Sequence, residues 1–253
     1  MSKTLQIRNL TIGQGCPKII VPIVGVTKEE IIDTAKDIKV ANPDIVEWRA
    51  DWFKEVFDFE KVKVVLCELR ATFGDTPILF TFRTAKEGGE KDIETERYAE
   101  LNRKAASTGL IDLIDVEVLT GDEIVRDIID AAHRFGVKVV ASNHDFLSTP
   151  EKGDIVSRLK KMDSLGADIP KIAVMPACRA DVITLLDATQ EADEAIGKPI
   201  MTISMSGTGL VSRLSGESFG SALTFGAVGK VSAPGQMNAE DLRLILELIH
   251  KSS

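Results

Sequence analysis

The feature that most constrains the fold is a regular alternation of short apolar runs with amphipathic stretches along the chain. Their starts lie roughly 25 to 35 residues apart, which is the size of a strand–helix unit in a parallel sheet. The alternation therefore predicts an α/β fold around parallel strands. The strand-like runs are 18–24, 44–50, 78–83, 111–118, 137–142, 171–175, 200–205 and 222–228.

The stretches between these runs carry apolar residues at helical spacing. Thr27, followed three residues later by Glu30, predicts a capping box at the start of the first helix. A shorter, glycine-rich helix is expected after Gly207. The other expected helices are 56–69, 95–106, 122–135, 151–165, 180–195 and 239–250.

Eight strand–helix units in 253 residues, without a Pro-, Gly- or Ser-rich linker, predict a single domain over 1–253. We expect a closed (β/α)8 TIM barrel, with residues 1–16 as a small N-terminal β-hairpin that closes one end. An open, doubly wound sheet is the alternative. It is disfavoured because no G-x-G-x-x-G opens the helix after the first strand.

Composition narrows the possible functions. A formal net charge of −8 without a Lys/Arg run argues against a nucleic-acid-binding surface. Cys16, Cys67 and Cys178 are widely spaced and form no C-x-x-C pair, and there is no H-E-x-x-H, so no metal is expected. No apolar stretch approaches the roughly 18–20 residues that span a bilayer, and the start lacks a secretory leader, so a cytoplasmic location without a membrane partner is expected.

Charged residues interrupt strands that should be buried on both faces. In the second run, Glu47, Arg49 and Asp51 alternate with apolar residues and so share the face that points into the barrel. Barrel active sites form at the carboxyl ends of strands, which favours a functional role. An internal ion-pair network is the alternative.

Two further strands end in charged residues. Arg83 closes the third run at the same rim, and the Gly88-Gly89 pair that follows gives its loop unusual backbone freedom. Asp115 and Glu117 end the fourth run on one face, and we expect them to be partners of the arginines.

Two residues could carry covalent and proton-transfer chemistry. His144 alone among three histidines falls at the tip of a strand, where it could transfer a proton near neutral pH, whereas His133 and His250 are expected to be solvated. Lys171 opens the sixth run and shares an inward face with Ala173. Burial favours the uncharged amine, which can condense with a ketone.

The last two loops supply further polar groups. Arg213 could hold a carboxylate with two hydrogen bonds, and 232–236 has the small, Pro- and Gly-bearing composition of a lid, although an ordinary loop is the alternative. One lysine, one histidine and several arginines and carboxylates at one rim point to Schiff-base chemistry on an anionic carbonyl compound, in a lyase or an aldolase.

The same residues resemble the type I 3-dehydroquinate dehydratase family of the shikimate pathway, which supplies chorismate for aromatic amino acid biosynthesis. The resemblance runs essentially end to end, in the same order and at similar spacing. It is concentrated in Glu47-Trp48-Arg49, Phe80-Thr81-Phe82-Arg83, Lys86-Glu87-Gly88-Gly89, Ser142-Asn143-His144-Asp145-Phe146, Ile169-Pro170-Lys171, Met205, Ser212-Arg213-Leu214, Phe225-Gly226-Ala227 and Ser232-Ala233-Pro234-Gly235-Gln236.

The resemblance implies a (β/α)8 homodimer that needs no cofactor or metal and converts 3-dehydroquinate to 3-dehydroshikimate plus water. Lys171 would form an imine with the substrate ketone, His144 would act as general base and then acid, and Glu87 would orient His144. Pro22 stands where family members often carry a serine, so one hydroxyl contact to substrate would be missing. The implied substrate-binding residues are Glu47, Trp48, Arg49, Arg83, Met205, Arg213, Phe225, Ser232, Ala233 and Gln236.

Two other functions stay open at this point. A class I aldolase would share the Schiff-base lysine but should recognise a phosphate. A catalytically silent barrel would bind a carboxylate metabolite without forming a covalent bond.

Overall fold

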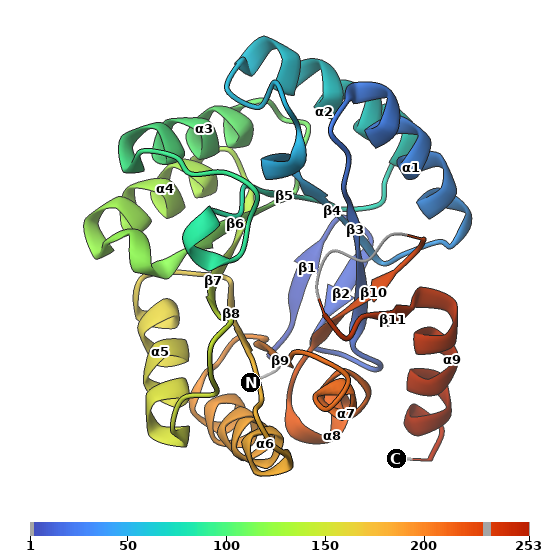
Figure 1. The fold of residues 1–253 in the computed structure, drawn as a ribbon, viewed down its shortest axis with the longest axis vertical. Coiled ribbons are helices and arrows are strands. Elements are labelled where there is room, and N and C mark those ends of the chain that lie inside the picture. Colours follow the sequence, from blue (N-terminus) through green and yellow to red (C-terminus); the bar gives the residue numbers. More distant parts are fainter. Residues whose placement is uncertain (1–2, 230–233, 253) are drawn as a thin grey trace.

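The computed structural model describes residues 3–229 and 234–252. Parallel strands curl into a ring, with the helices outside it (Figure 1). The sheet order is β11-β10-β3-β4-β5-β6-β7-β8-β9. The ring strands are β3 (Lys18–Ile23), β4 (Ile45–Arg49), β5 (Ile78–Thr81), β6 (Leu113–Glu117), β7 (Lys138–Asp145), β8 (Ile169–Val174), β9 (Met201–Ser204) and β10 (Leu223–Ala227).

The ring closes between its last two long strands, β9 and β10. The amide of Ala222 donates to the carbonyl of Ile200 at 2.9 Å, and Ile200 and Ser221 form an isolated parallel bridge. The short β11 (Met237–Asn238) extends the sheet beyond β10. The predicted (β/α)8 barrel is therefore confirmed.

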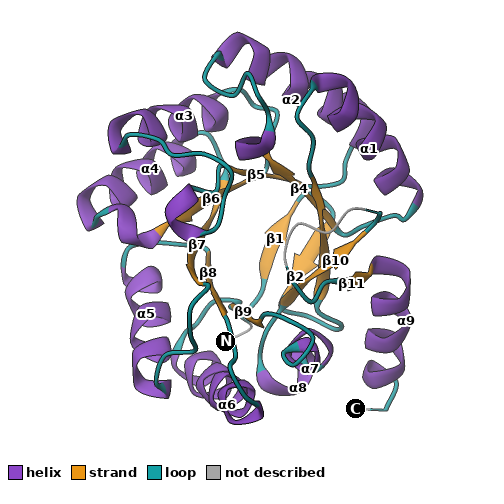
Figure 2. Cartoon of the chain, in the orientation of Figure 1, coloured by secondary structure: helices purple, strands orange, loops and turns teal. Residues whose placement is uncertain are grey.

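Helices cover the outer face of the ring (Figure 2). None of the helices in the described part of the chain is long and apolar enough to cross a membrane. The α-helices are α1 (Lys28–Val40), α2 (Phe59–Phe73), α3 (Thr95–Ser107), α4 (Asp122–Arg134), α5 (Lys152–Ser164), α6 (Arg179–Ala195), α7 (Leu210–Leu214), α8 (Gly216–Phe219) and α9 (Ala239–His250), and the 3₁₀ turns are η1 (Ala50–Trp52), η2 (Ala85–Glu87) and η3 (Val118–Thr120).

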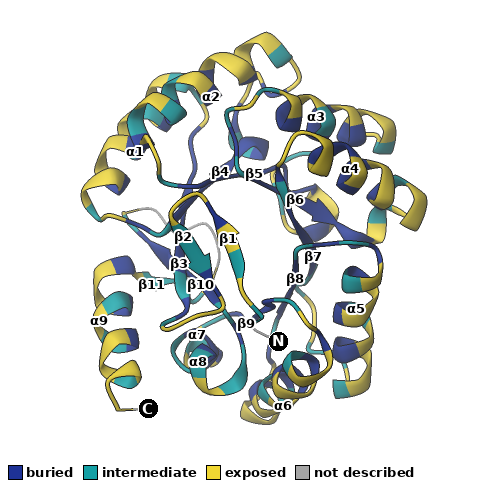
Figure 3. Cartoon of the chain, turned by 180° about the vertical axis from the view of Figure 1, so that it is seen from behind, coloured by how far each residue is buried: buried dark blue, intermediate teal, exposed yellow. Residues whose placement is uncertain are grey.

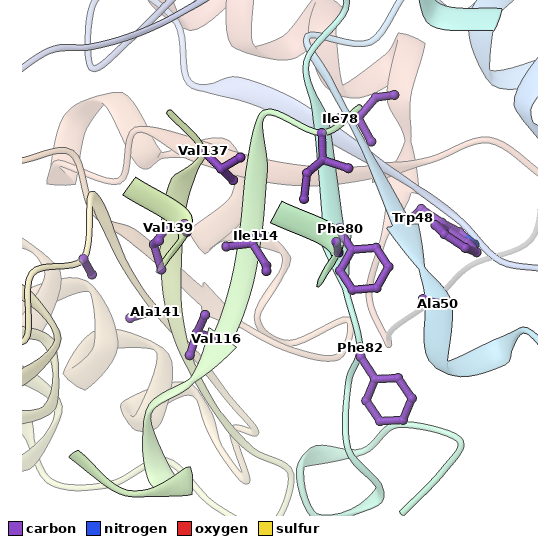
Figure 4. Close-up of a cluster of buried hydrophobic side chains, with 14 of the residues drawn as sticks. Trp48, Ala50, Ile78, Phe80, Phe82, Ile114, Val116, Val137, Val139 and Ala141 are labelled. Atoms are coloured by element: carbon purple, nitrogen blue, oxygen red, sulfur yellow. The ribbon is translucent and has the colours of Figure 1, made fainter. Parts of the chain in front are cut away.

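Alternation along each strand separates two apolar clusters. One cluster lies between strands and helices, and its members on β5 and β6 include Phe80 and Ile114 (Figure 4). The other includes Leu79 and Leu113 and fills the inside of the barrel. The charged side chains of β4, β6 and β8 that share this inward face lie nearer the carboxyl ends of the strands than most of the second cluster. The interior is therefore apolar at one end and charged at the other.

The amino-terminal strands form the predicted hairpin. β1 (Leu5–Ile7) pairs antiparallel with β2 (Leu10–Ile12), and the hairpin lies across the ring when the molecule is seen from behind (Figure 3). Ile7 and Ile12 are buried in the interior cluster beside Ile20. The hairpin thus closes the amino-terminal end of the barrel.

Three local predictions need correction. α2 begins at Phe59 rather than at residue 56, because the Asp58 side chain accepts the amide of Glu60 and so caps the helix there. At α1, Thr27 accepts the amide of Glu30 as predicted, but the Glu30 carboxylate binds the amide of Val26 and leaves the box incomplete.

The glycine-rich stretch after Gly207 forms two short helices, α7 and α8, instead of one.

Candidate active site

A cavity of about 210 Å³ opens at the carboxyl ends of the strands. Such a volume suits a small metabolite rather than a large cofactor. Ser232 and Ala233 lie outside the described residues. The predicted site residues that line the cavity are Glu47, Arg49, Arg83, Glu87, His144, Lys171, Met205, Arg213, Phe225 and Gln236.

Trp48 does not line the cavity, contrary to the prediction that it binds substrate. Its neighbours Glu47 and Arg49 point inward, so the alternation of β4 turns the indole outward, toward the helices. There its ring packs 5.6 Å from that of Phe80 and 6.1 Å from that of Phe53, between centroids (Figure 4). Trp48 is therefore a core residue.

Lys171 lies on the inward face of β8 and is 3% exposed. Its Nζ is 3.3 Å from Oδ2 of Asp115 and 4.9 Å from the ring centroid of Phe225. An inward-facing, buried amine at the cavity wall is the geometry predicted from the sequence. The carboxylate and the aromatic face hold the amine in position.

Arg83 is the centre of a buried ion-pair network. Its guanidinium lies 2.9 Å from Asp115, 2.9 Å from Glu117 and 3.5 Å from Glu87. Burial alone would lower the pKa of Arg83, but these carboxylates outweigh it and raise that pKa. Burial likewise opposes ionisation of Asp115, but Arg83 and Lys171 outweigh it and lower the pKa of Asp115. The prediction that β6 supplies partners for an arginine is confirmed.

Glu87 and His144 form a pair at one wall of the cavity. Oε2 of Glu87 lies 2.9 Å from Nδ1 of His144 and accepts the backbone amide of His144 at 2.9 Å. An ionised carboxylate only accepts hydrogen bonds, so Nδ1 then carries the ring proton and Nε2 keeps its lone pair. Ionised Glu87 thus fixes the tautomer of the imidazole.

Burial shifts the ionisation of both members of this pair. It lowers the pKa of His144 well below 6.5, and the charges of Arg83 and Lys171 lower it further. It also raises the pKa of Glu87 to about 7, although the charge of Arg83 opposes this rise. The imidazole is therefore neutral at physiological pH and able to accept a proton.

The loop that carries Glu87 depends on its two glycines. Gly88 has a φ of +83°, and a Cβ there would lie 2.3 Å from the Phe146 ring. A Cβ on Gly89 would lie 1.9 Å from the Arg83 carbonyl oxygen. The Gly-Gly pair therefore permits a close backbone approach that brings Glu87 to His144.

Arg213 is a buried cation that has no acidic partner in the described part of the chain. It is 1% exposed, and its Nη2 donates to the Pro234 carbonyl at 3.2 Å. Burial lowers the pKa of Arg213 to about 10, so the guanidinium stays charged at neutral pH. No acidic side chain among residues 3–229 and 234–252 forms a salt bridge with it. The cavity therefore presents a positive charge suited to an anionic group.

Arg49 and Glu47 also line the cavity. Arg49 donates two hydrogen bonds to Asp51, at 2.9 and 2.8 Å, and Glu47 accepts the hydroxyl of Thr81 at 2.9 Å. Asp51 was predicted to share their inward face, but it lies in η1 after the strand has ended and does not line the cavity. Its role is to hold Arg49.

Some lining residues were not predicted as part of the site. Ile203 precedes Met205 by two residues, so the alternation of β9 could have identified it. Phe146 and Pro234 lie in loops, where no periodicity signals an inward side chain. Pro22 is buried in β3 and does not line the cavity.

The other two histidines lie outside the cavity, and both side chains are partly exposed. His133 pairs with Asp168, and His250 pairs with Glu217.

Comparisons with known proteins identify the family of this chain. A family model described as type I 3-dehydroquinase matches residues 19–253. A 3-dehydroquinate dehydratase of Clostridioides difficile strain 630 is 53% identical over 253 residues, which cover 100% of this chain and 99% of that protein. One of Listeria innocua is 54% identical over 245 residues, 97% of each chain.

Solved structures give the same result. A crystal structure of type I 3-dehydroquinate dehydratase from Clostridium difficile, with covalent modified comenic acid, has a TM-score of 0.97 at 52% identity and full coverage of both chains. The enzyme of Geobacillus kaustophilus has a TM-score of 0.97 at 36% identity, covering 99% of this chain and 98% of that one. Because the family model matches nearly the whole length of the chain, the chain belongs to the type I 3-dehydroquinase family.

Proposed function

We propose that this chain is a hydro-lyase of the shikimate pathway that converts 3-dehydroquinate to 3-dehydroshikimate and water through an imine on Lys171. One observation carries the proposal: the buried amine of Lys171 and the Glu87–His144 pair line one small cavity, together with the guanidinium of Arg213, which has no acidic partner among residues 3–229 and 234–252. Family membership supports the substrate and the overall reaction.

The reaction begins when Lys171 releases one ammonium proton to solvent and its amine adds to the substrate ketone. The adduct takes one proton back from solvent and loses water, which leaves an iminium ion that withdraws electrons from the neighbouring carbon. Nε2 of His144 then takes a proton from that carbon, and the C–H electrons form an enamine. The enamine expels the β-hydroxyl group, to which His144 returns its proton, and a second water is released.

Hydrolysis of the remaining imine consumes one water and frees both Lys171 and 3-dehydroshikimate. The net reaction therefore releases one water, and no electron acceptor is needed.

The remaining lining residues have proposed roles in binding. Arg213 and Gln236 would hold the substrate carboxylate, since Arg213 has no acidic side chain beside it in the described part of the chain. Glu47 and Arg49 would contact ring hydroxyls, while Met205 and Phe225 would pack against the ring. Arg83 is already held by carboxylates of the protein, so its main contribution would be to position Asp115 and Glu87. Ser232 and Ala233 are proposed as loop contacts from the resemblance alone.

Borohydride reduction in the presence of 3-dehydroquinate tests the lysine. We expect a stable mass increase on the peptide that contains Lys171, because reduction converts the imine to a secondary amine. Lys171→Ala should lose turnover, followed by the absorbance of the conjugated enone, and should form no adduct. The control is Lys160→Ala, an exposed lysine on α5 that should retain both.

The result also separates the alternatives. A carboxylate-binding barrel without activity would bind 3-dehydroquinate but form no adduct. An aldolase would form the adduct with sugar phosphates rather than with 3-dehydroquinate. Dehydration by Lys171→Ala at the unmodified rate would refute the mechanism.

A second variant isolates the proton transfer. His144→Ala should still form the imine with 3-dehydroquinate, because the amine and the cavity remain, but elimination should slow by about 10²–10⁴-fold without the general base. Adduct mass and single-turnover absorbance measure the two steps separately. Equal slowing of both steps would contradict the assignment of His144. The homodimer and the cytoplasmic location stay predictions.

A further inference from the structure

Three side chains with metal-binding atoms meet at the amino-terminal end of the barrel, opposite the cavity. Cys16 lies just before β3, Glu217 lies in α8, and His250 is the last residue of α9. One potential ligand atom from each lies within 4.8 Å of the others. This is the one group of three or more such side chains found among residues 3–229 and 234–252.

The contacts within this group are incomplete. Nδ1 of His250 lies 2.6 Å from Oε1 of Glu217, which holds the imidazole against the carboxylate. Oε2 of Glu217 is buried and has no hydrogen-bond partner in the described part of the chain. Sγ of Cys16 makes only a weak contact, 3.8 Å from the carbonyl of Leu246. A buried carboxylate oxygen without a donor is costly, so this group lacks a cation or another donor.

The donor types select a class of ion. Thiolate, imidazole and carboxylate together are ligands of Zn²⁺, whereas Mg²⁺ and Ca²⁺ prefer oxygen alone. Ionised Cys16 and Glu217 supply two negative charges, which match a divalent cation. Zinc sites are usually recognised by closely spaced cysteines and histidines, whereas here Cys16 lies about 200 residues before Glu217, and His250 lies 33 residues after Glu217. Only the folded barrel brings them together.

We propose that Cys16, Glu217 and His250 bind a divalent transition-metal ion of the zinc type, with water at the fourth position. On binding, the Cys16 thiol loses one proton to solvent, and any proton on the coordinating nitrogen of His250 moves to the other ring nitrogen. The ion would join the segment before the first barrel strand to the end of the last helix. It would therefore stabilise the fold without taking part in the reaction at the opposite end.

Cobalt substitution tests the ligand set. Reduced, tag-free protein titrated with Co²⁺ should develop a near-ultraviolet sulfur-to-cobalt charge-transfer band and the visible bands of a tetrahedral site. Cys16→Ser should lose the charge-transfer band, and His250→Ala should lose the tetrahedral bands. Cys67→Ser removes an exposed cysteine from α2 and should leave the spectrum unchanged. A band that persists in Cys16→Ser, or no band in the unmodified protein, would overturn the proposal.

Zinc affinity and thermal stability give a second readout. Zn²⁺ competed against a chromophoric chelator should bind at one equivalent, and Cys16→Ser and His250→Ala should each weaken binding at least about 10-fold. Zn²⁺ should raise Tm of the unmodified protein and of Cys67→Ser, but not of the two ligand variants. Equal affinities in all four proteins would mean adventitious binding only. Dehydratase activity, which should stay unchanged in the absence of metal, shows that each variant is folded.

Discussion

At the scale of single residues, the Glu87–His144 pair shows how burial sets ionisation. The imidazole is held neutral because its charged form is poorly solvated and lies near cations. Glu87 accepts hydrogen bonds from His144 and so orients the imidazole. The same burial disfavours the charged form of Glu87 itself. Burial of this pair therefore carries a cost in stability that depends on pH.

We expect Glu87→Gln to alter the pH dependence of stability. The pKa of Glu87 is about 7 in the folded state and about 4.5 when unfolded, so the folded state retains a proton that the unfolded state has lost between these values. The Glu87 carboxyl therefore adds to the free energy of unfolding below about pH 4.5. This contribution, up to about 3 kcal/mol, is lost as the pH rises through 7.

Urea unfolding at about pH 5 and pH 8 measures this effect. The unmodified protein should lose more stability between the two values than Glu87→Gln, which cannot titrate at this position. The exposed Glu96→Gln should behave like the unmodified protein. Parallel pH profiles for all three proteins would show that the carboxyl of Glu87 does not hold this proton.

The sequence predicted which side chains lie at the cavity where chemistry and strand position agreed. Lys171 and His144 are rare side chains in strands that should be apolar, and both reach the cavity. The prediction that Trp48 binds substrate was wrong, because a match to a family motif does not say which way each side chain points. Period-two alternation contained that information, since Trp48 falls on the opposite face from Glu47 and Arg49.

At the scale of elements, β5 and β6 meet through charges rather than through apolar packing at their carboxyl ends. Arg83, just beyond β5, binds Asp115 and Glu117 of β6, and Thr84 donates both its amide and its hydroxyl to Glu117. Such a buried network holds together only if each charge keeps its partner.

Arg83→Met should therefore destabilise the fold by about 3–5 kcal/mol, since it leaves buried carboxylates uncompensated. The midpoint and slope of urea unfolding measure the change. Arg103 pairs with Asp127 on the surface, and Arg103→Met should cost under about 1 kcal/mol. Comparable losses in the two variants would mean that the network around Arg83 does not stabilise the barrel.

Element positions were predictable from periodicity to within a few residues, while element ends were not. The start of α2 was missed by three residues because a single side chain, Asp58, decides it. β7 continues to Asp145, so His144 lies within the strand rather than after it. Capping and the last ladder hydrogen bonds depend on local geometry, which an apolar pattern does not encode.

At the scale of the whole molecule, the two ends of the barrel have separate tasks. The carboxyl end carries the charged cavity, and the amino end is closed by apolar side chains of the hairpin. This division was predictable, because a (β/α)8 barrel fixes which strand ends can form a site.

Ile12→Ala should therefore lower stability without changing catalysis. Ile12 is fully buried in the interior cluster, so its truncation should cost about 2–5 kcal/mol. kcat and KM for 3-dehydroquinate should remain within about twofold, because the hairpin lies at the end away from the cavity. Val40→Ala, at an 85% exposed position, should change neither quantity. A large rise in KM for Ile12→Ala would show that the two ends are coupled.

The contact that closes the ring between β9 and β10 is the place where we expect neighbouring strands to separate first. β7 and β8 share a ladder of six residue pairs, whereas the β9–β10 closure rests on one isolated bridge. At this closure the Ser221 hydroxyl accepts the amide of Thr202 at 3.1 Å in place of a backbone carbonyl. Amide protons of Thr202 and Ala222 should exchange with deuterium before those in the middle of β7. A transient opening of the barrel would then begin where β9 and β10 meet. While these strands are apart, the barrel would be a curled sheet with two free edges.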